Sequence, residues 1–172
     1  MPKTYFNNAV TGNSGMLACI TDRGELVRLF WPNIDYPQHI DRFFCGIFIK
    51  DREYTTTWLH DWDWSHSQCY IEDTNIVKTV CENGNRGLRV IQEDFVLPYT
   101  DILIRKYEVQ NIGNHDMDLG FMVYSSGIST NPHLAGVLFD FESDALVHYR
   151  HGYYISISGS CAAYQFQLGN NA

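Results

Sequence analysis

Apolar, β-branched and aromatic residues recur along the chain in runs of strand length, and turn-forming residues separate these runs. The first clear unit joins Met16–Thr21 to Leu26–Trp31 through a short connection that contains Gly24, which predicts a β-hairpin. No segment shows a sustained apolar stripe at i, i+3, i+4 and i+7 with helix caps. The pattern therefore predicts a chain that is almost entirely β.

Further strands are expected at regular intervals, with linkers rich in Gly, Asn, Asp and Pro between them. The expected ranges are Phe43–Ile49, Ile76–Glu82, Leu88–Val96, Ile102–Gln110, Leu119–Tyr124, Val137–Phe141, Ala145–Arg150 and Tyr153–Ser158. Strands spaced in this way indicate antiparallel sheets packed as a sandwich. The fold class is predicted to be an all-β, antiparallel β-sandwich.

The run Ile102–Gln110 predicts how one strand is oriented. Lys106 and Glu108 fall on one face, and Tyr107 and Val109 fall on the other. We expect the second face to meet the core and the first to meet water.

Composition and charge narrow the class of protein. The 172 residues are 45% hydrophobic, which fits one soluble globular domain over 1–172. A formal net charge of -8 disfavours nucleic acid and an anionic membrane surface as partners. The N-terminus lacks the apolar stretch of a secretory signal, so a cytoplasmic location is expected.

The five cysteines stand singly, without a CxxC pair, so they are expected to be buried free thiols and no zinc site is expected. The sequence shows no GxSxG motif, no P-loop, and no GxGxxG in a strand-to-helix context. Serine hydrolase, NTPase and dinucleotide-binding functions are therefore unsupported, and no cofactor is expected.

The densest cluster of aromatic and charged residues runs from Trp58 to His66. If this segment is extended, its aromatic and histidine side chains share one face, opposite a face that carries two aspartates. Indole faces stack on sugars and carboxylates accept hydroxyl hydrogen bonds, so the segment could contact a carbohydrate or a neighbouring domain. An equally weighted alternative is sandwich core with solvated aspartates. The candidate contact residues are Trp58, His60, Trp62 and Trp64.

Two catalytic or metal-binding interpretations of this cluster are weaker. An extended chain would separate His60 from His66 by about 20 Å, so they could not share a metal ion. Asp61 and Asp63 could form an inverting carboxylate pair, but adjacent same-face aspartates are far more often surface residues. No residue is assigned a catalytic role.

A second candidate segment follows the first hairpin. Pro32 and Pro37 stiffen the loop, and its residues Trp31, Tyr36 and His39 could contact a ligand or could hold the loop on its own sandwich. Trp31 and His39 complete the candidate contact residues.

Several motifs resemble the start of bacterial and archaeal glucoamylases of glycoside hydrolase family fifteen. They are Thr11–Ala18, Gly24–Pro32, Asp35–His39, Glu93–Gly113 and Asp118–Ser126. The resemblance implies a super-β-sandwich of the galactose-mutarotase-like type. In that family the sandwich is an N-terminal accessory domain that precedes a catalytic (α/α)6 barrel, which releases glucose from α-glucans. None of the barrel lies in this chain, so the resemblance carries over no catalytic residue.

The family's sandwich generally continues for more strands than this chain supplies. The sandwich could therefore be truncated, and a sandwich without those strands would have exposed edges that favour pairing with a second copy or require local repacking. Three functions remain open: a non-catalytic domain that packs on its barrel, an independent carbohydrate-binding module with the three tryptophans as its platform, and a sugar-converting enzyme such as an aldose epimerase. The last requires a His and carboxylate pair that the sequence does not display.

Overall fold

The computed structural model describes residues 7–36, 38–50, 55–127, 135–150 and 152–169. The regular elements of these residues are strands, and their pairings are antiparallel. Their bounds are β1 Ala9–Gly12, β2 Leu17–Ile20, β3 Leu26–Phe30, β4 Ile40–Ile49, β5 Thr55–Trp58, β6 Ser65–Tyr70, β7 Val77–Asn83, β8 Leu88–Val96, β9 Leu103–Asn111, β10 Leu119–Gly127, β11 Ala135–Asp140, β12 Ala145–Arg150 and β13 Tyr153–Ser158. No helix long and apolar enough to cross a membrane is found in the described part of the chain.

The chain divides into two compact units, Met1–Ser126 and Gly127–Ala172. No linker-like composition marks this division in the sequence. Each unit is described separately below.

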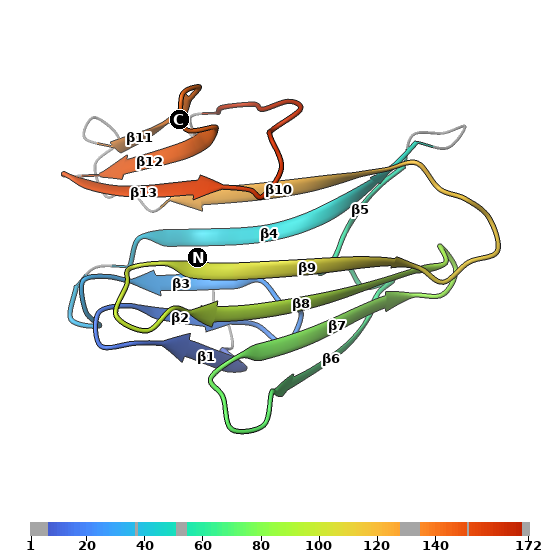
Figure 1. The fold of residues 1–172 in the computed structure, drawn as a ribbon, viewed down its shortest axis with the longest axis horizontal. Coiled ribbons are helices and arrows are strands. Elements are labelled where there is room, and N and C mark those ends of the chain that lie inside the picture. Colours follow the sequence, from blue (N-terminus) through green and yellow to red (C-terminus); the bar gives the residue numbers. More distant parts are fainter. Residues whose placement is uncertain (1–6, 37, 51–54, 128–134, 151, 170–172) are drawn as a thin grey trace. The chain divides into compact units, whose positions relative to one another are not determined.

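In the first unit two sheets pack face to face (Figure 1). Sheet A has the order β1-β2-β3-β4-β10, with β5 also paired to β4, and sheet B has the order β6-β7-β8-β9. The sheets are joined by polar contacts as well as apolar ones. The hydroxyl of Thr11 accepts a hydrogen bond from the Val96 amide at 3.4 Å, and Arg105 donates to the Phe43 carbonyl at 3.2 Å.

Sheet B shows why these sequences form strands. Along β7 and β8 buried residues alternate strictly with half-buried ones, so each strand places every second side chain in the core. The buried positions of β8 are Leu88, Val90, Gln92, Asp94 and Val96. Two of these five are polar, which makes the core between the sheets unusual.

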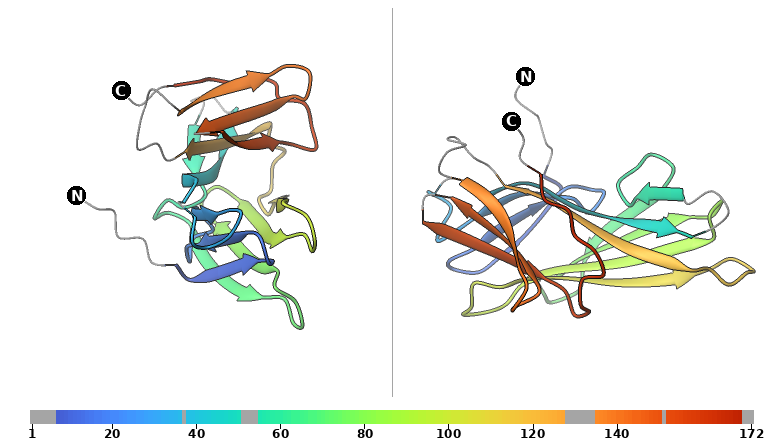
Figure 2. Two further views of the ribbon diagram at one scale, coloured as in Figure 1. Left: turned by 90° about the vertical axis from the view of Figure 1, so that its left-hand side faces the viewer. Right: turned by 90° about the horizontal axis from the view of Figure 1, so that it is seen from above.

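In the second unit β11, β12 and β13 form a three-stranded antiparallel sheet, sheet C (Figure 2). Its register places Gly136, Tyr149 and Tyr154 side by side on one face. Of the residues described in these three strands, Ala145 alone is buried.

The predicted all-β class, the hairpin at Gly24 and the other expected strands are confirmed, most of them within three residues at each end. Lys106 and Glu108 are exposed and Tyr107 is half-buried, as expected for β9, but Val109 is 39% exposed, so the expected core face is only partly covered. Strands β1, β5 and β6 were not predicted from the sequence. Of these, β6 is polar and largely exposed, so it has no apolar alternation to detect.

Candidate functional site

Residues 59–64 form a turn between β5, which ends at Trp58, and β6, which begins at Ser65. The segment Trp58–His66 is therefore not extended throughout, and the single aromatic face considered for an extended segment does not arise. The Asp61 carboxylate accepts a hydrogen bond from the Trp58 amide at 3.0 Å, and the Asp61 amide donates to the Trp58 carbonyl at 3.1 Å. The Trp64 amide then donates to the Asp61 carbonyl. An aspartate that bonds its own backbone in this way favours a turn over a strand.

The turn sends the three tryptophans of the segment into different surroundings. Trp62 is 89% exposed, whereas Trp64 is 4% exposed and its indole nitrogen donates to the Thr57 hydroxyl at 2.8 Å. Trp58 is half-buried. The platform of three stacked tryptophans therefore does not form.

Trp58 and His60 lie instead around Phe44 on sheet A, in a group that also contains Tyr124; we call these four residues the Phe44 cluster. The ring centroid of Phe44 lies 5.1 Å from that of Trp58, 4.5 Å from that of His60 and 4.7 Å from that of Tyr124. A Cβ built at Gly46 would lie 2.6 Å from the Trp58 ring, so the close approach of Trp58 to β4 requires glycine there. The cluster is half-buried, and Tyr124 is 41% exposed.

His60 is the titratable member of the Phe44 cluster. Burial lowers its pKa, and the nearby charges of Glu25 and Asp61 oppose that shift. Its Nδ1 atom is buried and has no hydrogen-bond partner among the described residues. His60 is therefore predominantly neutral at neutral pH, and its ring adds apolar contact area to the cluster.

Asp61 and Asp63 both have structural roles. Asp61 holds the turn, while Asp63 accepts a hydrogen bond from Asn83 at 3.0 Å and pairs with Arg86 at 3.4 Å. These contacts tie the turn to the end of β7, and they account for both carboxylates without a catalytic role.

Trp31 and His39 hold their loop on sheet A. His39 is 6% exposed, and its Nε2 lies 2.7 Å from the Trp31 carbonyl oxygen. The His39 amide donates to the Leu29 carbonyl at 2.8 Å. Through these contacts the two residues hold the loop on its own sandwich, which is one of the two roles considered for them. Tyr36 is 39% exposed.

The first unit contains a buried ion pair that was not predicted from the sequence. The Arg105 Nε atom lies 2.7 Å from Asp94 Oδ1, and the two side chains are 6% and 0% exposed. Arg105 also donates to the carbonyls of Phe43 and Gly24, and Gln92 donates to Gly24 and to the second Asp94 oxygen. The two-residue period of a strand could have revealed the pair. It places Asp94 on the same face of β8 as the buried Val90 and Val96, and Arg105 on the same face of β9 as Tyr107.

The surroundings of this pair shift the pKa of neighbouring groups. Burial opposes the charge of Arg105, but Asp94 outweighs it, and the pKa of Arg105 lies above its ordinary value. Burial also raises the pKa of Cys45 to about 11 and that of Cys81 to about 12, so both are neutral thiols. Cys19 is buried as expected, but Cys69 and Cys161 are exposed, which corrects the expectation that all five cysteines are buried.

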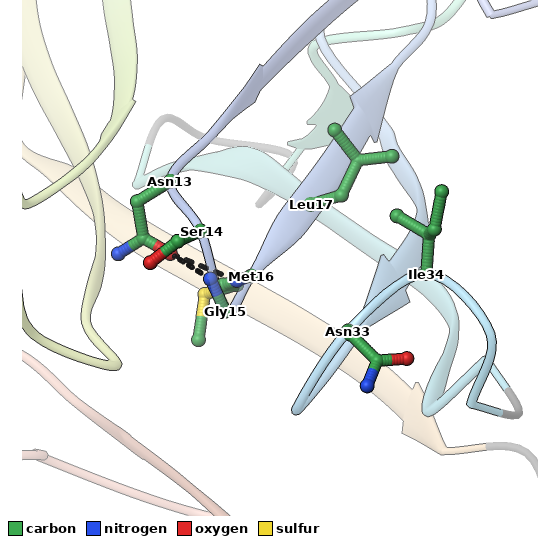
Figure 3. Close-up of a pocket in the computed structure, with 7 residues that line it drawn as sticks. All are labelled: Asn13, Ser14, Gly15, Met16, Leu17, Asn33 and Ile34. Atoms are coloured by element: carbon green, nitrogen blue, oxygen red, sulfur yellow. Dashed lines mark hydrogen bonds between the residues drawn. The ribbon is translucent and has the colours of Figure 1, made fainter.

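A small hollow of about 220 Å³ lies beside the β1–β2 turn, lined by residues 13–17, Asn33 and Ile34 (Figure 3). The side chain of Asn13 is hydrogen-bonded to the backbone. Its Oδ1 accepts from the amides of Gly15 and Met16, and its Nδ2 donates to the carbonyls of Leu97 and Thr100. Typical ligand pockets measure about 300–1,000 Å³ and place several polar groups toward the ligand. This hollow is smaller, and its amide is already fully bonded.

Comparisons with known proteins identify relatives of the chain. No family model matches it. An uncharacterized glycosyl hydrolase from Methanocaldococcus jannaschii is 31% identical over 166 residues, a match that covers 96% of this chain and 26% of that protein. The crystal structure of a bacterial glucoamylase complexed with acarbose superimposes with a TM-score of 0.74 at 14% identity, over 91% of this chain and 24% of that one.

The chain thus spans about a quarter of the length of each of these proteins. These matches confirm the resemblance that the motifs between Thr11 and Ser126 indicated. The chain is a homologue of a glycosyl hydrolase, and it has the β-sandwich fold of the glucoamylase N-terminal domain.

Proposed function

We propose that this chain is the non-catalytic N-terminal domain of a glucoamylase-like enzyme, and that it packs on and shapes a barrel that hydrolyses α-glucosidic bonds. The observation that carries the proposal is the extent of the homology, which takes in nearly all of this chain and only 26% of a glycosyl hydrolase. The carboxylates of the candidate site support it, because Asp61 and Asp63 are engaged in holding the fold.

The surface that we assign to the barrel contact includes Trp62 and the Phe44 cluster. Trp62 is 89% exposed and lies in the same turn as His60 of the cluster, and tryptophan is typical of the residues that anchor protein contacts. Trp31 and His39 serve this surface indirectly by fixing the loop on sheet A. A cytoplasmic location is part of the proposal, and the unpaired exposed thiols of Cys69 and Cys161 support it.

The test is a fusion in which this chain replaces the matched region of the M. jannaschii homologue. We expect the fusion to release glucose from maltoheptaose and to melt at a higher temperature than the homologue with that region deleted. The isolated 172-residue chain should release no glucose. Release that scales with the concentration of the isolated chain would overturn the non-catalytic assignment, and a deletion protein as stable and active as the fusion would overturn the packing role.

Two variants locate the contact within the fusion. Trp62→Ala should lower its melting temperature if the indole packs on the barrel. Tyr99→Ala is the matched control, because Tyr99 is also a fully exposed aromatic residue of the first unit but lies in a different loop. Equal effects of the two substitutions would count against a contact at Trp62.

A further inference from the structure

The two faces of sheet C differ in chemistry. One face carries five half-buried apolar residues, together with Ala135, His148, Arg150 and Tyr153; the five are Val137, Phe139, Leu146, Ile155 and Ile157. The opposite face, which we call the tyrosine face, carries Gly136, Leu138, Asp140, Ala145, Val147, Tyr149, Tyr154, Ser156 and Ser158. The tyrosines and serines of this second face combine apolar rings with hydroxyl groups.

The two tyrosines of this face lie directly opposite each other on neighbouring strands. Tyr149 of β12 pairs with Tyr154 of β13 on one side and with Gly136 of β11 on the other. The exposed fractions are 39% for Tyr149 and 71% for Tyr154. No hydrogen bond or ring contact holds either phenol among the described residues, so both rings are available to a ligand.

Gly136 determines how the Tyr149 ring lies. A Cβ built at this glycine would stand 2.7 Å from Tyr149 Cζ and closer still to the hydroxyl oxygen. The ring therefore extends across β11 and lies over the glycine backbone instead of projecting into solvent. Tyr154 lies on the other side of Tyr149, on β13, and its side chain is 71% exposed.

We propose that the tyrosine face binds a glucan chain, with the Tyr149 and Tyr154 rings each in contact with a sugar unit of that chain. Sugar rings offer apolar C–H faces to aromatic rings and hydroxyls to polar neighbours, and the exposed Ser156 lies on the same face. The charged residue on this face is Asp140, an anion, which disfavours phosphorylated ligands. The choice of an α-linked glucan rests on the function proposed above.

A protein partner is the competing occupant, and the composition of the face argues against it. Tyrosine is common in protein interfaces, but the core of such an interface is depleted in Ser, Asp and Ala. The tyrosine face carries Asp140, Ala145, Ser156 and Ser158 besides its two tyrosines. On the tyrosine face Leu138 is 45% exposed, and the neighbouring positions Ser156 and Ser158 are small, exposed and polar. A shallow aromatic surface flanked by hydroxyls fits an extended polysaccharide better than a folded protein.

Affinity electrophoresis of the full chain tests the proposal, in native gels that contain soluble starch, hydroxyethylcellulose or no polysaccharide. We expect starch to retard the chain, and Tyr149→Ala and Tyr154→Ala each to raise the apparent Kd about fivefold to tenfold. Tyr164→Ala is the matched control, since Tyr164 is a fully exposed tyrosine of the same unit outside the sheet, and it should leave the mobility unchanged.

Gly136→Ala tests whether the position of the Tyr149 ring matters, because this variant keeps both tyrosines. The added methyl group meets the flexible end of Tyr149, so the ring should tilt away while the fold is retained. We expect this variant to lose most of the retardation in starch while its melting temperature stays within about 2 °C of the parent chain.

The outcomes that overturn the proposal are distinct. Unchanged mobility in every gel would remove the glucan site and leave the accessory-domain function standing, because packing on a barrel requires no sugar binding. Retardation that survives both tyrosine variants would place binding elsewhere. Retardation in hydroxyethylcellulose alone would overturn the choice of an α-linked glucan. A dimer by size-exclusion chromatography that Tyr154→Ala dissociates would show that the face binds a second copy.

Discussion

Sheet B and sheet C are both antiparallel sheets joined by short turns, but they differ in how their side chains are covered. In β7 and β8 every second residue is buried, and the buried set includes Asp94 with its ion-pair partner. In sheet C, Ala145 is the one buried residue of the described strands, although Val, Leu, Ile and Phe are as frequent there. An apolar alternation therefore predicts a strand, but only an opposing layer makes that strand part of a core.

Breaking the ion pair should give the largest effect. Arg105→Ala leaves the fully buried Asp94 carboxylate without its cation, so we expect the free energy of unfolding to fall by about 3–5 kcal/mol. Urea denaturation followed by tryptophan fluorescence measures the change. The double variant Asp94→Leu/Arg105→Met should recover most of the loss, because it removes both charges at similar volume. A single variant as stable as the parent chain would show that the pair is hydrated.

A matched pair of leucines compares the two sheets directly. Leu88 in β8 is 0% exposed and Leu138 in β11 is 45% exposed. We expect Leu88→Ala to lower the free energy of unfolding by about 2–4 kcal/mol, since it opens a cavity, and Leu138→Ala to change it by about 0.5 kcal/mol or less. Similar losses from the two substitutions would mean that the surface of sheet C is covered in solution.

The smallest expected effect is a pH dependence from His148 in sheet C. Burial lowers its pKa below the ordinary 6.5, so on acidification the unfolded chain takes up the proton first and the folded state loses stability. The loss should begin near pH 6.5, continue down to the lowered pKa, and stay below about 1 kcal/mol, because solvent screens the half-buried ring. Urea denaturation at pH 7.5, 6.5 and 5.5 measures it. His148→Gln should flatten this part of the profile, and an unchanged profile would assign the dependence to another group.

Local patterns predicted most of the strands and the resemblance predicted the fold, but the candidate site was only partly predictable. The tryptophans at 58, 62 and 64 have the spacing of one strand face, and only the Asp61 hydrogen bonds convert that spacing into a turn. The ion pair was not predicted because charged residues are usually exposed. The alternation along the strands nevertheless places Asp94 and Arg105 on the inner faces. The tyrosine face depends on Gly136 lying opposite Tyr149, a long-range register that no single run of sequence contains.

The buried ion pair also selects the alignment of the strands that carry it. Asp94 and Arg105 are direct partners across β8 and β9. If β9 slipped by one residue, Arg105 would turn toward solvent, and Lys106 and Glu108 would enter the core beside Asp94. That misaligned sheet would bury two carboxylates with one cation, so at least one buried charge would be uncompensated, a penalty of several kcal/mol. Two residues whose desolvation is costly in the folded state thus discriminate against the nearest wrong fold.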